Sequence, residues 1–423
     1  MEGYTDVVVI GGGPAGMMAA IKAAQNEASV TLLEKNPLCG RKLAITGKGR
    51  CNITNTKSWQ EFSNHIHPKS NFLKSSFWGF SNKDAIAFFE EHGLETVLTQ
   101  GDRVFPKSMK AFDVVDTFVA VMHKYNVDVR TDCELLTITK APEGGYTCIY
   151  VQTTTSSRLV SCMINSKSVV IATGGLAYPS TGSTGKGYEL AQSFGHTITE
   201  CFPSLTALIP KFYSSDFYDI ELKNVGLSLF VDKDLVQTDM GDLTFTEGGI
   251  EGSLGYRLSR KAVKALKNGT SVELVLDLKP AIDLETLKNR VKREIEKFDW
   301  GSNLVNDARM KKLLRKFMPS ELINPFVDSN DNLNSHNLAE RLKDWRFPIK
   351  DYVGYRRAVV TAGGVDLGEI VSKSMQSKLS PGLFFAGEVL DIDGDTGGYN
   401  LQTAYSTGAM AGVSAAKYVH NKL

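Results

Sequence analysis

The chain has 423 residues, of which 42% are hydrophobic and 22% charged, and its formal net charge is +1. This length exceeds that of one ordinary hydrophobic core, so the chain is expected to fold as two or three domains. The near-zero charge offers no global argument for a nucleic-acid or membrane partner.

Targeting signals and metal-binding patterns are missing from the sequence. No apolar run reaches the roughly 18 residues that span a bilayer, and no basic segment precedes the first apolar run as in a signal peptide. The six cysteines lack C-x-x-C or zinc-like spacing. We therefore expect a cytoplasmic protein with mostly reduced thiols, no metal site, no membrane partner and no disulfide-exchange activity. No motif indicates an obligate protein partner.

The chain begins with the pattern of a dinucleotide-binding unit. Val7–Ile10 form an apolar run typical of a parallel strand buried on both faces, and Gly11-Gly12-Gly13-Pro14-Ala15-Gly16 follows directly. The alanine-rich segment Ala15–Ala24 predicts a helix, and Ser29–Leu33 predicts the next strand. This is the order that accompanies G-x-G-x-x-G in a nucleotide site. A basic, glycine-rich loop is expected from there to Asn55.

The glycines of this motif have separate roles. Gly11 permits the tight turn, Gly13 lets the backbone approach a pyrophosphate, and Gly16 lets the helix pack closely on the strand. The helix N-terminus presents unpaired N–H groups and a partial positive charge to the phosphates. Glu34, at the end of the second strand, is placed to accept hydrogen bonds from ribose hydroxyls. A glycine turn that only packs would leave this acid unexplained.

The following segment alternates helical and strand patterns. Apolar residues recur at helical spacing in Asp84–His92 and in Ala111–Tyr125. A buried parallel strand, Ser168–Ala172, ends in Thr173-Gly174-Gly175, where the backbone must again approach another group closely. Shorter strands and hairpins are predicted at 127–129, 135–138 and 146–151, and in the segment that ends at Ile164.

From about Pro203 the pattern changes to a β-rich and then a helical insertion. Leu227–Val231 and Val272–Leu276 alternate as antiparallel strands of a sandwich or small barrel do. Apolar residues then follow helical spacing from Leu284 to Phe298 and from Met310 to Phe317. Between positions 288 and 316, ten Lys and Arg residues stand against four Asp and Glu residues, an excess of six positive charges. This excess indicates either a solvated helix face or an anionic partner.

The C-terminal segment returns to the first pattern. Ala358–Gly364 predicts a strand and a glycine turn, and Leu383–Glu388 a strand followed by a glycine and an acid. Gly397–Gln402 opens a small-residue helix that runs to about Val419. The dinucleotide domain is therefore expected to be split by the insertion. Its two parts are predicted at 1–200 and 358–423, a β-rich barrel at 201–281 with about 345–357, and a helical subdomain at 282–344.

The distant segments favour FAD over a nicotinamide cofactor. A nicotinamide dehydrogenase would usually continue with a second βαβ half, whereas here the Thr173 turn, the Gly387-Glu388 turn and the last helix could close over a second part of one ligand. Glu388 could accept hydrogen bonds from ribitol hydroxyls, and N–H groups at Asn400-Leu401 could reach the flavin pyrimidine edge. Cations of the Gly40–Arg50 loop would favour an anionic reduced flavin.

Four blocks of sequence, in order, resemble one family. They are GRKLAITGKGRCNITN, ATGGLAYPSTGSTGKGY, TAGGV and AGEVLDIDGDTGGYNLQTAYSTG. Together they are similar to the HI0933-like flavoproteins, a family of NAD(P)/FAD-dependent oxidoreductases that includes bile-acid enone reductases. The resemblance implies an α/β fold in which a Rossmann-type FAD-binding domain is split by an inserted β-barrel and a small helical subdomain. It also implies tight, non-covalent FAD, with NAD(P)H as a transient reductant.

Carried over by position, the resemblance implies a set of FAD contacts from both halves of the split domain. The first half would supply Gly11, Gly13, Pro14, Ala15, Gly16, Glu34, Lys35, Arg41, Lys42, Gly47, Gly49, Arg50, Cys51 and Asn52. Later segments would supply Leu135 on the adenine side, and Ala172, Thr173, Gly174, Gly387, Glu388, Gly398, Asn400 and Leu401.

Two positions depart from the family pattern. The family often has F-T-H-x-G-x-S-G-P in the insertion, where this chain has Phe245-Thr246-Glu247-Gly248-Gly249. Lys186 stands where an acid is expected. These changes leave the expectation of FAD binding intact, but they prevent transfer of a substrate from any characterised member.

The leading functional hypothesis is an NAD(P)H-fed reductase of an activated C=C bond. Hydride would pass from flavin N5 to the β-carbon while a positioned acid protonates the α-carbon. Tyr178 and Tyr399 adjoin glycines of the flavin loops and are the candidate acids, although buried tyrosines more often only pack. Cys51 has no adjacent His or second Cys, so backbone contact with FAD is expected of it rather than a nucleophilic role.

Three alternatives are left open by the sequence. The same hydride chemistry could reduce uridine to dihydrouridine in ribosomal RNA, with the basic helical block contacting phosphates. A flavin amine oxidase would pass electrons from a small amine to oxygen and respond little to NAD(P)H. A non-catalytic protein would hold FAD without turnover. No motif encodes the substrate, the oligomeric state or the choice between NADH and NADPH.

Overall fold

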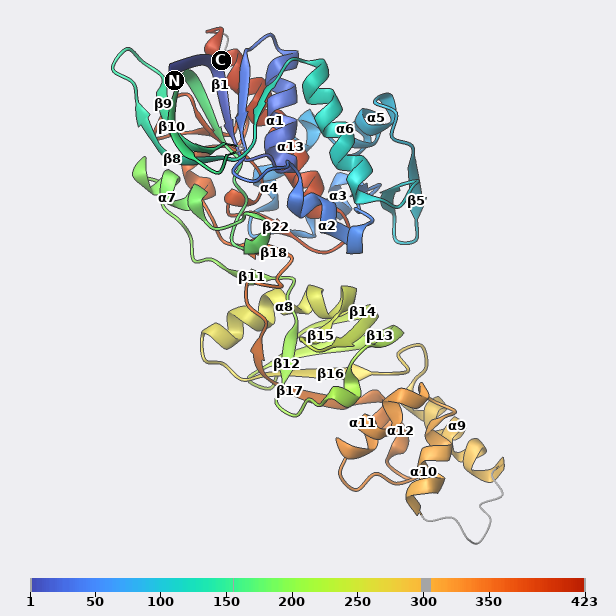
Figure 1. The fold of residues 1–423 in the computed structure, drawn as a ribbon. Helices are drawn as coiled ribbons and strands as arrows, with labels where there is room; N and C mark the ends of the chain where they lie inside the picture. Colours follow the sequence, from blue (N-terminus) through green and yellow to red (C-terminus); the bar gives the residue numbers. More distant parts are fainter. Residues whose placement is uncertain (1, 155, 298–305, 422–423) are drawn as a thin grey trace. The chain divides into compact units, whose positions relative to one another are not determined.

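The computed structural model describes residues 2–154, 156–297 and 306–421. The chain divides into two compact units (Figure 1). Met1–Phe202 and Val359–Leu423 together form one, here called the sheet unit, and Pro203–Ala358 form the other, here called the barrel unit. Two distant parts of the chain therefore make a single unit, and the segment between them makes the second.

The sheet unit is built on a nine-stranded mixed sheet. Its parallel centre has the order β21-β10-β1-β2-β7, which confirms the Rossmann-type fold. Val7, Val8 and Val9 of β1 are completely buried, as their apolar run predicts. β19 and β20 extend one edge, and β8 and β9 form a hairpin beside β10. The strands are β1 (Glu2–Ile10), β2 (Val30–Leu33), β7 (Asp128–Arg130), β8 (Cys133–Lys140), β9 (Tyr146–Thr153), β10 (Leu159–Ile171), β19 (Ile370–Val371), β20 (Gln376–Ser377) and β21 (Leu383–Phe385).

The predicted strands that end at Ile164 and begin at Ser168 are in fact one strand, β10. On one side, β10 pairs antiparallel with β9 and then in parallel with β21. On its other side it pairs in parallel with β1 throughout the second part of its length. The polar residues between the two predicted strands do not interrupt the ladder, because Ser166 is small and lies buried between Thr5 and Tyr146.

Helices α1 (Pro14–Gln25) and α13 (Tyr399–Val419) pack against each other beside the sheet (Figure 1). Small residues allow this approach: a Cβ atom on Gly408 would lie 2.3 Å from Ala15 O, and one on Gly412 would lie 2.2 Å from Ala19 O. The predicted small-residue C-terminal helix is confirmed. The other helices of this unit are α2 (Arg41–Gly49), α3 (Trp59–Ser63), α4 (Ser70–Gly79), α5 (Asn82–Glu91), α6 (Ala111–Lys124) and α7 (Lys186–Ser193), with 3-10 turns η1 (Pro179–Thr181), η4 (Leu367–Glu369) and η5 (Gly387–Val389).

Several short strands complete this part of the fold. β3 and β5 both pair with β6, and β4 pairs with β22. The β4–β22 ladder holds Ile66 and His67 against the turn that precedes α13. The strands are β3 (Thr54–Asn55), β4 (Ile66–His67), β5 (Thr96–Thr99), β6 (Arg103–Pro106), β11 (Phe202–Ser204), β18 (Val360–Ala362) and β22 (Asp393–Gly394).

The basic segment predicted as a loop begins as a helix, α2. Its N-cap, Gly40, has φ of 72°, and Leu43 and Ala44 are buried. A Cβ atom on Gly40 would lie 2.8 Å from the Val115 side chain on α6, so the glycine lets α2 start directly against that helix. Burial of the apolar face stabilises the first turns, and the dihedrals become non-helical at Thr46–Lys48. The loop prediction is therefore wrong for the first half of the segment.

The barrel unit contains a closed barrel of order β12-β15-β14-β13-β16-β17. The alternating segments predicted from sequence thus form a small barrel and not a sandwich. Leu227 and Leu229 of β13 and Leu274 and Leu276 of β16 are completely buried and fill its interior. The strands are β12 (Leu208–Pro210), β13 (Ile220–Val231), β14 (Asp234–Thr246), β15 (Gly249–Glu251), β16 (Val272–Asp277) and β17 (Trp345–Tyr352).

The barrel unit also contains five helices within the described residues, four of which lie in the segment 282–344. α8 was not predicted, although Leu254, Leu258 and Ala262 recur at helical spacing and are completely buried. Phe298, expected in the first basic helix, lies outside the described residues. None of the helices within the described ranges is long and apolar enough to cross a membrane. The helices are α8 (Gly252–Lys267), α9 (Leu284–Lys297), α10 (Asn306–Leu314), α11 (Ile323–Asp328) and α12 (Leu338–Lys343), with 3-10 turns η2 (Ser215–Phe217) and η3 (Ser320–Leu322).

Candidate functional site

Four neighbouring parallel strands end at one edge of the sheet, and each leads into a segment that the sequence assigns to cofactor binding. β1 leads into the glycine turn, β2 into Glu34, β10 into Ala172–Gly174, and β21 into Ala386–Glu388. The N–H groups of Gly11, Ala172 and Ala386 donate to the last carbonyl of an adjacent strand, at 2.8, 2.9 and 3.0 Å respectively. The fold therefore brings these distant sequence segments together.

The glycines of the first turn differ in what surrounds them. A Cβ atom on Gly11 would lie 2.6 Å from Ala172 O, and one on Gly16 would lie 1.9 Å from Gly11 O. One on Gly13 would meet nothing within 4 Å. Packing of the protein thus requires Gly11 and Gly16, whereas the space over Gly13, the N-cap of α1, is open. This open space is where the pyrophosphate of a dinucleotide would approach the backbone.

The start of α1 also faces the β21 turn. A Cβ atom on Gly387 would lie 2.7 Å from Ala15 Cβ, and Gly387 has φ of 76°. Its N–H group donates to Thr407 Oγ1 of α13 at 3.0 Å. Pro14 and Ala15 thus form the first turn of α1 beside a backbone turn that comes from the far end of the chain.

Glu34 is held rigidly at the end of β2. Its Oε2 accepts from Gly12 N–H at 2.7 Å, and its Oε1 accepts from Asn36 N–H at 2.8 Å. Arg41 Nη1 donates to Asn36 Oδ1 at 2.7 Å, so Arg41 supports the acid through Asn36. Cys133 N–H donates to Glu34 O, which brings the start of β8, with the buried Leu135, to the same end of the sheet.

Lys42 and Glu388, predicted separately as cofactor contacts, form an ion pair with each other. Lys42 Nζ lies 2.8 Å from Glu388 Oε2, and both side chains keep about a fifth of their surface accessible, 23% and 20%. Thr361 N–H donates to Glu388 Oε1 at 2.9 Å. The carboxylate is therefore oriented by the protein itself, next to the open edge.

The remaining predicted cations are more exposed. Arg41, Lys48 and Arg50 are exposed, and Arg50 Nε donates to Gly47 O at 3.1 Å. The Arg50 guanidinium lies 5.7 Å from the centre of the Phe105 ring. Lys35 Nζ donates to Thr184 Oγ1 at 3.1 Å.

Three non-glycine residues of these loops have left-handed backbone. Lys48, Cys51 and Tyr178 have φ values of 57°, 57° and 54°, a region that bulky residues seldom adopt and that often marks functional sites. The glycines at 47 and 49 share it, with φ of 58° and 81°. Burial raises the pKa of the Cys51 thiol to about 12, so this cysteine is not a thiolate nucleophile at neutral pH.

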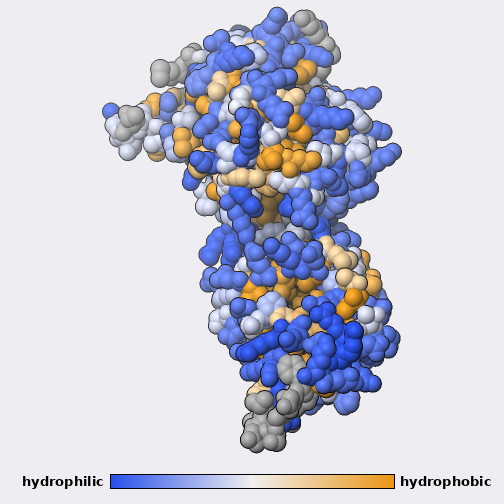
Figure 2. Space-filling model, turned by 90° about the vertical axis from the view of Figure 1, so that its right-hand side faces the viewer, coloured by the Kyte–Doolittle hydropathy of each residue, from blue (hydrophilic) through white to orange (hydrophobic). Residues whose placement is uncertain are grey.

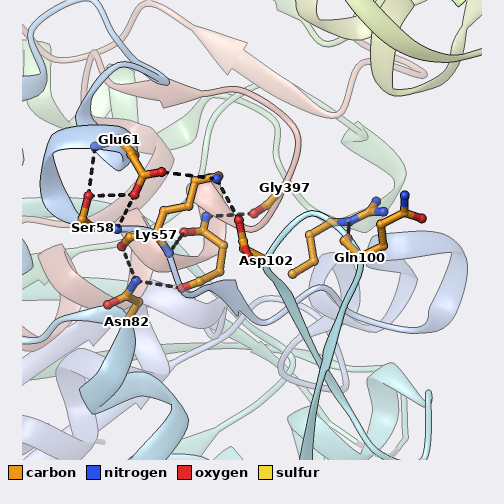
Figure 3. A network of polar contacts seen from close by, with 9 residues as sticks. Lys57, Ser58, Glu61, Asn82, Gln100, Asp102 and Gly397 are labelled. Carbon is orange, nitrogen blue, oxygen red and sulfur yellow. Dashed lines mark hydrogen bonds and ion pairs between the residues drawn. The ribbon is translucent and has the colours of Figure 1, made fainter. Parts of the chain in front are cut away.

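Asparagine side chains fix the turn that begins α13 (Figure 3). Asn52, with its amide oxygen toward the helix, accepts from Gly398 N–H at 3.0 Å. Asn55 Nδ2 donates to Gly397 O at 2.9 Å, and Asn82 Nδ2 donates in turn to Asn55 O at 2.8 Å. Figure 3 shows how the Lys57–Asp102 ion pair, at 2.9 Å, closes the same network. The sequence analysis singled out Asn52 only, because the other partners are distant in the chain.

The N-termini of α1 and α13 are both without a side-chain cap. The Asn400 side chain instead closes the preceding turn, donating to Gly394 O at 2.7 Å and accepting from Gly394 N–H at 2.8 Å. Gly398 and the half-buried Leu401 flank it. A helix N-terminus without a side-chain cap presents backbone N–H groups and partial positive charge to an anion.

One polar atom at the edge lacks a partner. Thr173 Oγ1 is buried without a hydrogen-bond acceptor or donor in the described part of the chain. It lies at the end of β10, next to Gly174 with φ of 72°. It faces Gly187, since a Cβ atom there would lie 2.0 Å from Thr173 Oγ1. The open Gly13 turn, the oriented acids and the two helix N-termini form a donor and acceptor set that fits FAD.

The two tyrosines proposed as acids are placed differently. Tyr178 is half-buried and precedes η1. Tyr399 is 4% exposed, and its ring packs on Phe62 at 4.9 Å and stacks on His65 at 4.6 Å. Neither position by itself assigns a catalytic role.

Comparison with known proteins decides the family. The model of the HI0933-like protein Rossmann domain matches residues 5–414. The chain belongs to the HI0933-like family. It is accordingly an FAD-dependent oxidoreductase, in agreement with the donor and acceptor set described above.

Relatives of this HI0933-like chain match it from end to end. A 3-dehydro-bile acid delta(4,6)-reductase of Clostridium scindens is 28% identical over 97% of this chain and 98% of its own length. Ribosomal RNA dihydrouridine synthases of Haemophilus influenzae and Escherichia coli are 28% and 30% identical, over 99% and 95% of this chain and 100% and 96% of their own.

Solved structures share the fold at lower identity. A 3-ketosteroid delta1-dehydrogenase of Sterolibacterium denitrificans has a TM-score of 0.52 with 12% identity, covering 98% of this chain and 99% of its own. The E. coli quinol fumarate reductase chain FrdA has a TM-score of 0.51 with 13% identity, covering 99% of this chain and 71% of its own. At these identities the likeness concerns the fold alone.

Proposed function

We propose that this protein reduces a C=C bond conjugated to a carbonyl group, with FAD as the bound cofactor and NAD(P)H as its transient reductant. The observation that carries the proposal is the end-to-end similarity to relatives named as a delta(4,6)-reductase and as dihydrouridine synthases. Saturation of an enone and saturation of uracil are the same chemistry: hydride adds to the β-carbon and a proton to the α-carbon.

The chain's own residues would bind and orient the cofactor at the edge described above. The start of α1 and the open Gly13 turn would accept the pyrophosphate, and Glu34 the ribose. Glu388, oriented by Lys42 and the Thr361 N–H group, would accept a ribitol hydroxyl. The N-terminus of α13 would favour negative charge at the flavin pyrimidine edge. When bound, FAD supplies the hydride transfer.

We favour a small enone as the substrate, because the overall charge of the chain gives no argument for a polyanionic partner. The formal net charge is +1. Two cations of the basic helical block are already paired: Lys288 with Glu285 and Glu340, and Lys297 with Glu294. Glu285 and Glu340 lie outside the counted segment, so their ion pairs with Lys288 offset part of its excess positive charge.

A second candidate, reduction of uridine in ribosomal RNA, is supported by the cations that remain. Lys292, Arg293, Arg315 and Lys316 are exposed on or directly after α9 and α10. Arg290 lies 5.4 Å from the centre of the Phe317 ring, which draws the two helices together. Figure 2 shows deep blue, hydrophilic side chains over the helical part of the barrel unit. Such a surface could contact phosphates.

Anaerobic stopped-flow absorbance tests the proposal. The purified, FAD-loaded protein is mixed with NADPH or NADH, and the long-wavelength flavin band is followed. We expect fast bleaching, followed by recovery of the band when a steroid enone is added. No bleaching by either nucleotide, together with bleaching by small amines, would indicate an amine oxidase instead.

The second candidate is separated from the first by the oxidising substrate. Reduced protein is mixed with undermodified ribosomal RNA, and dihydrouridine is measured by mass spectrometry. If the flavin band recovers when RNA is added, and does not recover with any enone tested, the RNA substrate is favoured. In that case, Lys292→Glu with Arg293→Glu should abolish the recovery with RNA, while Lys288→Glu, at a paired position, should have a smaller effect.

A further inference from the structure

A cluster of ionisable residues adjoins the N-terminus of α13 and was not singled out by any motif. β4 pairs antiparallel with β22, which places His67 opposite Asp393. The next residue but one, Asp395, lies between two imidazoles. His65 Nδ1 is 2.8 Å from Asp395 Oδ2, and His67 Nε2 is 3.4 Å from Asp395 Oδ1. The backbone adds a further link, since Asp395 N–H donates to His65 O at 3.0 Å.

The chemistry of this pair fixes the tautomer of His65. Burial of Asp395 disfavours its charged form, but hydrogen bonds from His65 and His67 outweigh burial and lower the carboxyl pKa to about 2. A carboxylate only accepts hydrogen bonds, so His65 Nδ1 must carry the proton that it shares with Asp395. Nε2 is then the ring atom left to exchange protons with a substrate, as in the Asp–His pairs of acid–base catalysts.

Packing fixes the plane of the same ring. The His65 imidazole stacks on the Tyr399 ring with a centroid distance of 4.6 Å and an interplanar angle of 28°. Tyr399 is the first residue of α13 and is 4% exposed, whereas the His65 side chain is 34% exposed. Of the two rings, the imidazole is the one that a substrate can reach. Its neighbour Asp395 belongs to the turn that leads into the proposed flavin-binding helix N-terminus.

We infer that His65 is the proton donor for the reduced C=C bond and that Asp395 is its positioning residue. This inference rests on the proposed function and names the acid that the sequence left unassigned. Hydride, with two electrons from the reduced cofactor, forms the C–H bond at the β-carbon. The resulting enolate takes the Nε2 proton of the His65 imidazolium at its α-carbon. Asp395 stabilises the imidazolium, and the neutral imidazole then regains a proton from water, so charge and atoms balance.

The first test uses the cofactor-free protein and therefore does not depend on activity. Histidine labelled with 15N at both ring atoms is observed by NMR, and the His65 signals are assigned by their loss in His65→Gln. We expect the Nδ1–H tautomer in the neutral form and its loss in Asp395→Asn, whose amide can donate to Nδ1. A neutral His65 that carries its proton on Nε2 in the unaltered protein would overturn the inference.

The second test separates the two half-reactions of the FAD-loaded protein. Reduction by NAD(P)H needs no proton donor to the C=C substrate, so His65→Gln should change its rate less than twofold. Reoxidation by the enone should slow by about 10²- to 10⁴-fold, the usual contribution of a general acid. Asp395→Asn should slow the same step by a smaller factor. His123→Gln, at an exposed histidine of α6, is the matched control and should alter neither step.

The outcomes distinguish this inference from the proposed function. If the unaltered protein is not reoxidised by any conjugated C=C compound, the proposed function fails. If it is reoxidised and His65→Gln reacts equally fast, His65 is not the donor. Tyr399→Phe keeps the stacked ring and removes only the hydroxyl. If Tyr399→Phe slows reoxidation by the enone more than His65→Gln does, Tyr399 is the proton donor and the inference is overturned.

Discussion

Gly13 and Gly16 of the G-x-G-x-x-G motif differ in the space that is available for a side chain. A Cβ atom on Gly16 would overlap Gly11 O at 1.9 Å, whereas one on Gly13 would meet no protein atom within 4 Å. Gly16→Ala should therefore destabilise the cofactor-free protein by about 1–3 kcal/mol, the usual cost of overpacking. Gly13→Ala should leave that stability within about 0.5 kcal/mol, as for a substitution without new contacts, but should weaken FAD binding at least tenfold.

Urea unfolding of the cofactor-free variants and FAD titration by fluorescence quenching measure the two effects. Gly354→Ala is the control, since its Cβ atom would also meet nothing within 4 Å but lies in the barrel unit. If Gly13→Ala binds FAD as tightly as the unaltered protein, the ligand does not approach the backbone at this position.

Asp395 should make stability depend on pH in the acid range. Its pKa is lowered from 3.8 to about 2 in the folded protein. A depressed carboxyl pKa stabilises the fold above the unfolded-state value, and this contribution is lost as pH falls from about 4 to about 2. The shift corresponds to about 2 kcal/mol. Urea unfolding of cofactor-free protein across this range should show a weaker pH dependence in Asp395→Asn. An unchanged slope would contradict the His65–Asp395–His67 geometry.

At this scale, sequence predicts residues that act through local motifs and misses those that act through distant partners. The glycine turn, Glu34 and the Gly387-Glu388 turn are found at the sheet edge because each directly follows a recognisable strand. The ion pair of Lys42 with Glu388 joins residues 346 positions apart, and the His65–Asp395 pair joins residues 330 apart. No periodicity or spacing in one sequence marks such pairs.

Among the secondary-structure elements, one edge of the sheet is locked by a buried histidine. His196, after α7, is completely buried at its side chain, with Nδ1 2.9 Å from Glu369 Oε2 and Nε2 2.7 Å from Ser377 Oγ. Ser377 Oγ also accepts from Leu379 N–H at 3.0 Å and Ser380 N–H at 2.9 Å. Because Ser377 Oγ already accepts two hydrogen bonds, its hydroxyl group donates its proton to His196 Nε2. The Ser–His–Glu arrangement resembles a hydrolase triad. However, Ser377 is buried and its hydroxyl is fully hydrogen-bonded, so these three residues have a structural role.

Removing this histidine should loosen β19 and β20. His196→Ala leaves a buried hydroxyl and a half-buried carboxylate without their partner, which should cost about 2 kcal/mol or more. Hydrogen exchange should show faster exchange of Ser377 and Ser380 amides than of β1 amides. His123→Ala, at an exposed position on α6, is the control. Equal free energies of unfolding for the two variants would show that the hydrogen bonds of His196 do not stabilise the fold.

The type of an element could be predicted from sequence where its pattern was strong. The ends of an element could not be predicted where tertiary packing determines them. The apolar runs of β1 and β21 and the small-residue helix α13 follow from sequence. The polar residues inside β10 indicated a break, yet pairing with β1 on one side and β9 on the other carries the strand through. Gly40 and Gly47 indicated a loop, yet burial of Leu43 against the core lets α2 form between them.

At the scale of the whole molecule, the sheet unit is made of two separate parts of the chain. The segment just before the chain leaves this unit is hydrogen-bonded to the segment just after it returns. Thr199 N–H donates to Gly364 O at 2.8 Å, and Gly364 N–H donates to Thr199 Oγ1 at 3.0 Å. All four strand ends of the candidate FAD edge belong to this unit. The barrel unit has its own closed barrel and buried interior.

Replacing Pro203–Ala358 with a short glycine–serine linker should therefore leave a protein that binds FAD. The Thr199–Gly364 contacts already hold the joined ends close, so the linker adds little loop-closure entropy. Absorbance and equilibrium dialysis should show stoichiometric FAD with affinity within about tenfold of the full chain, a loss of at most about 1.4 kcal/mol. Loss of FAD binding in a folded deletion protein would show that the barrel unit completes the cofactor site.

The discontinuity of the sheet unit also sets an order of events during synthesis. Residues up to Phe202 leave the ribosome first, but β21 and α13, which complete the sheet and cover α1, are made only after the barrel unit. The barrel unit, which is one continuous segment of the chain, can fold while the first half of the sheet unit still lacks β21 and α13. The apolar surface of α1 that α13 covers is exposed to water, or to a chaperone, until α13 has been synthesised. We therefore expect the complete FAD edge to form only after α13 has been synthesised, and a truncation that removes α13 should produce an aggregating protein and not a weakly binding one.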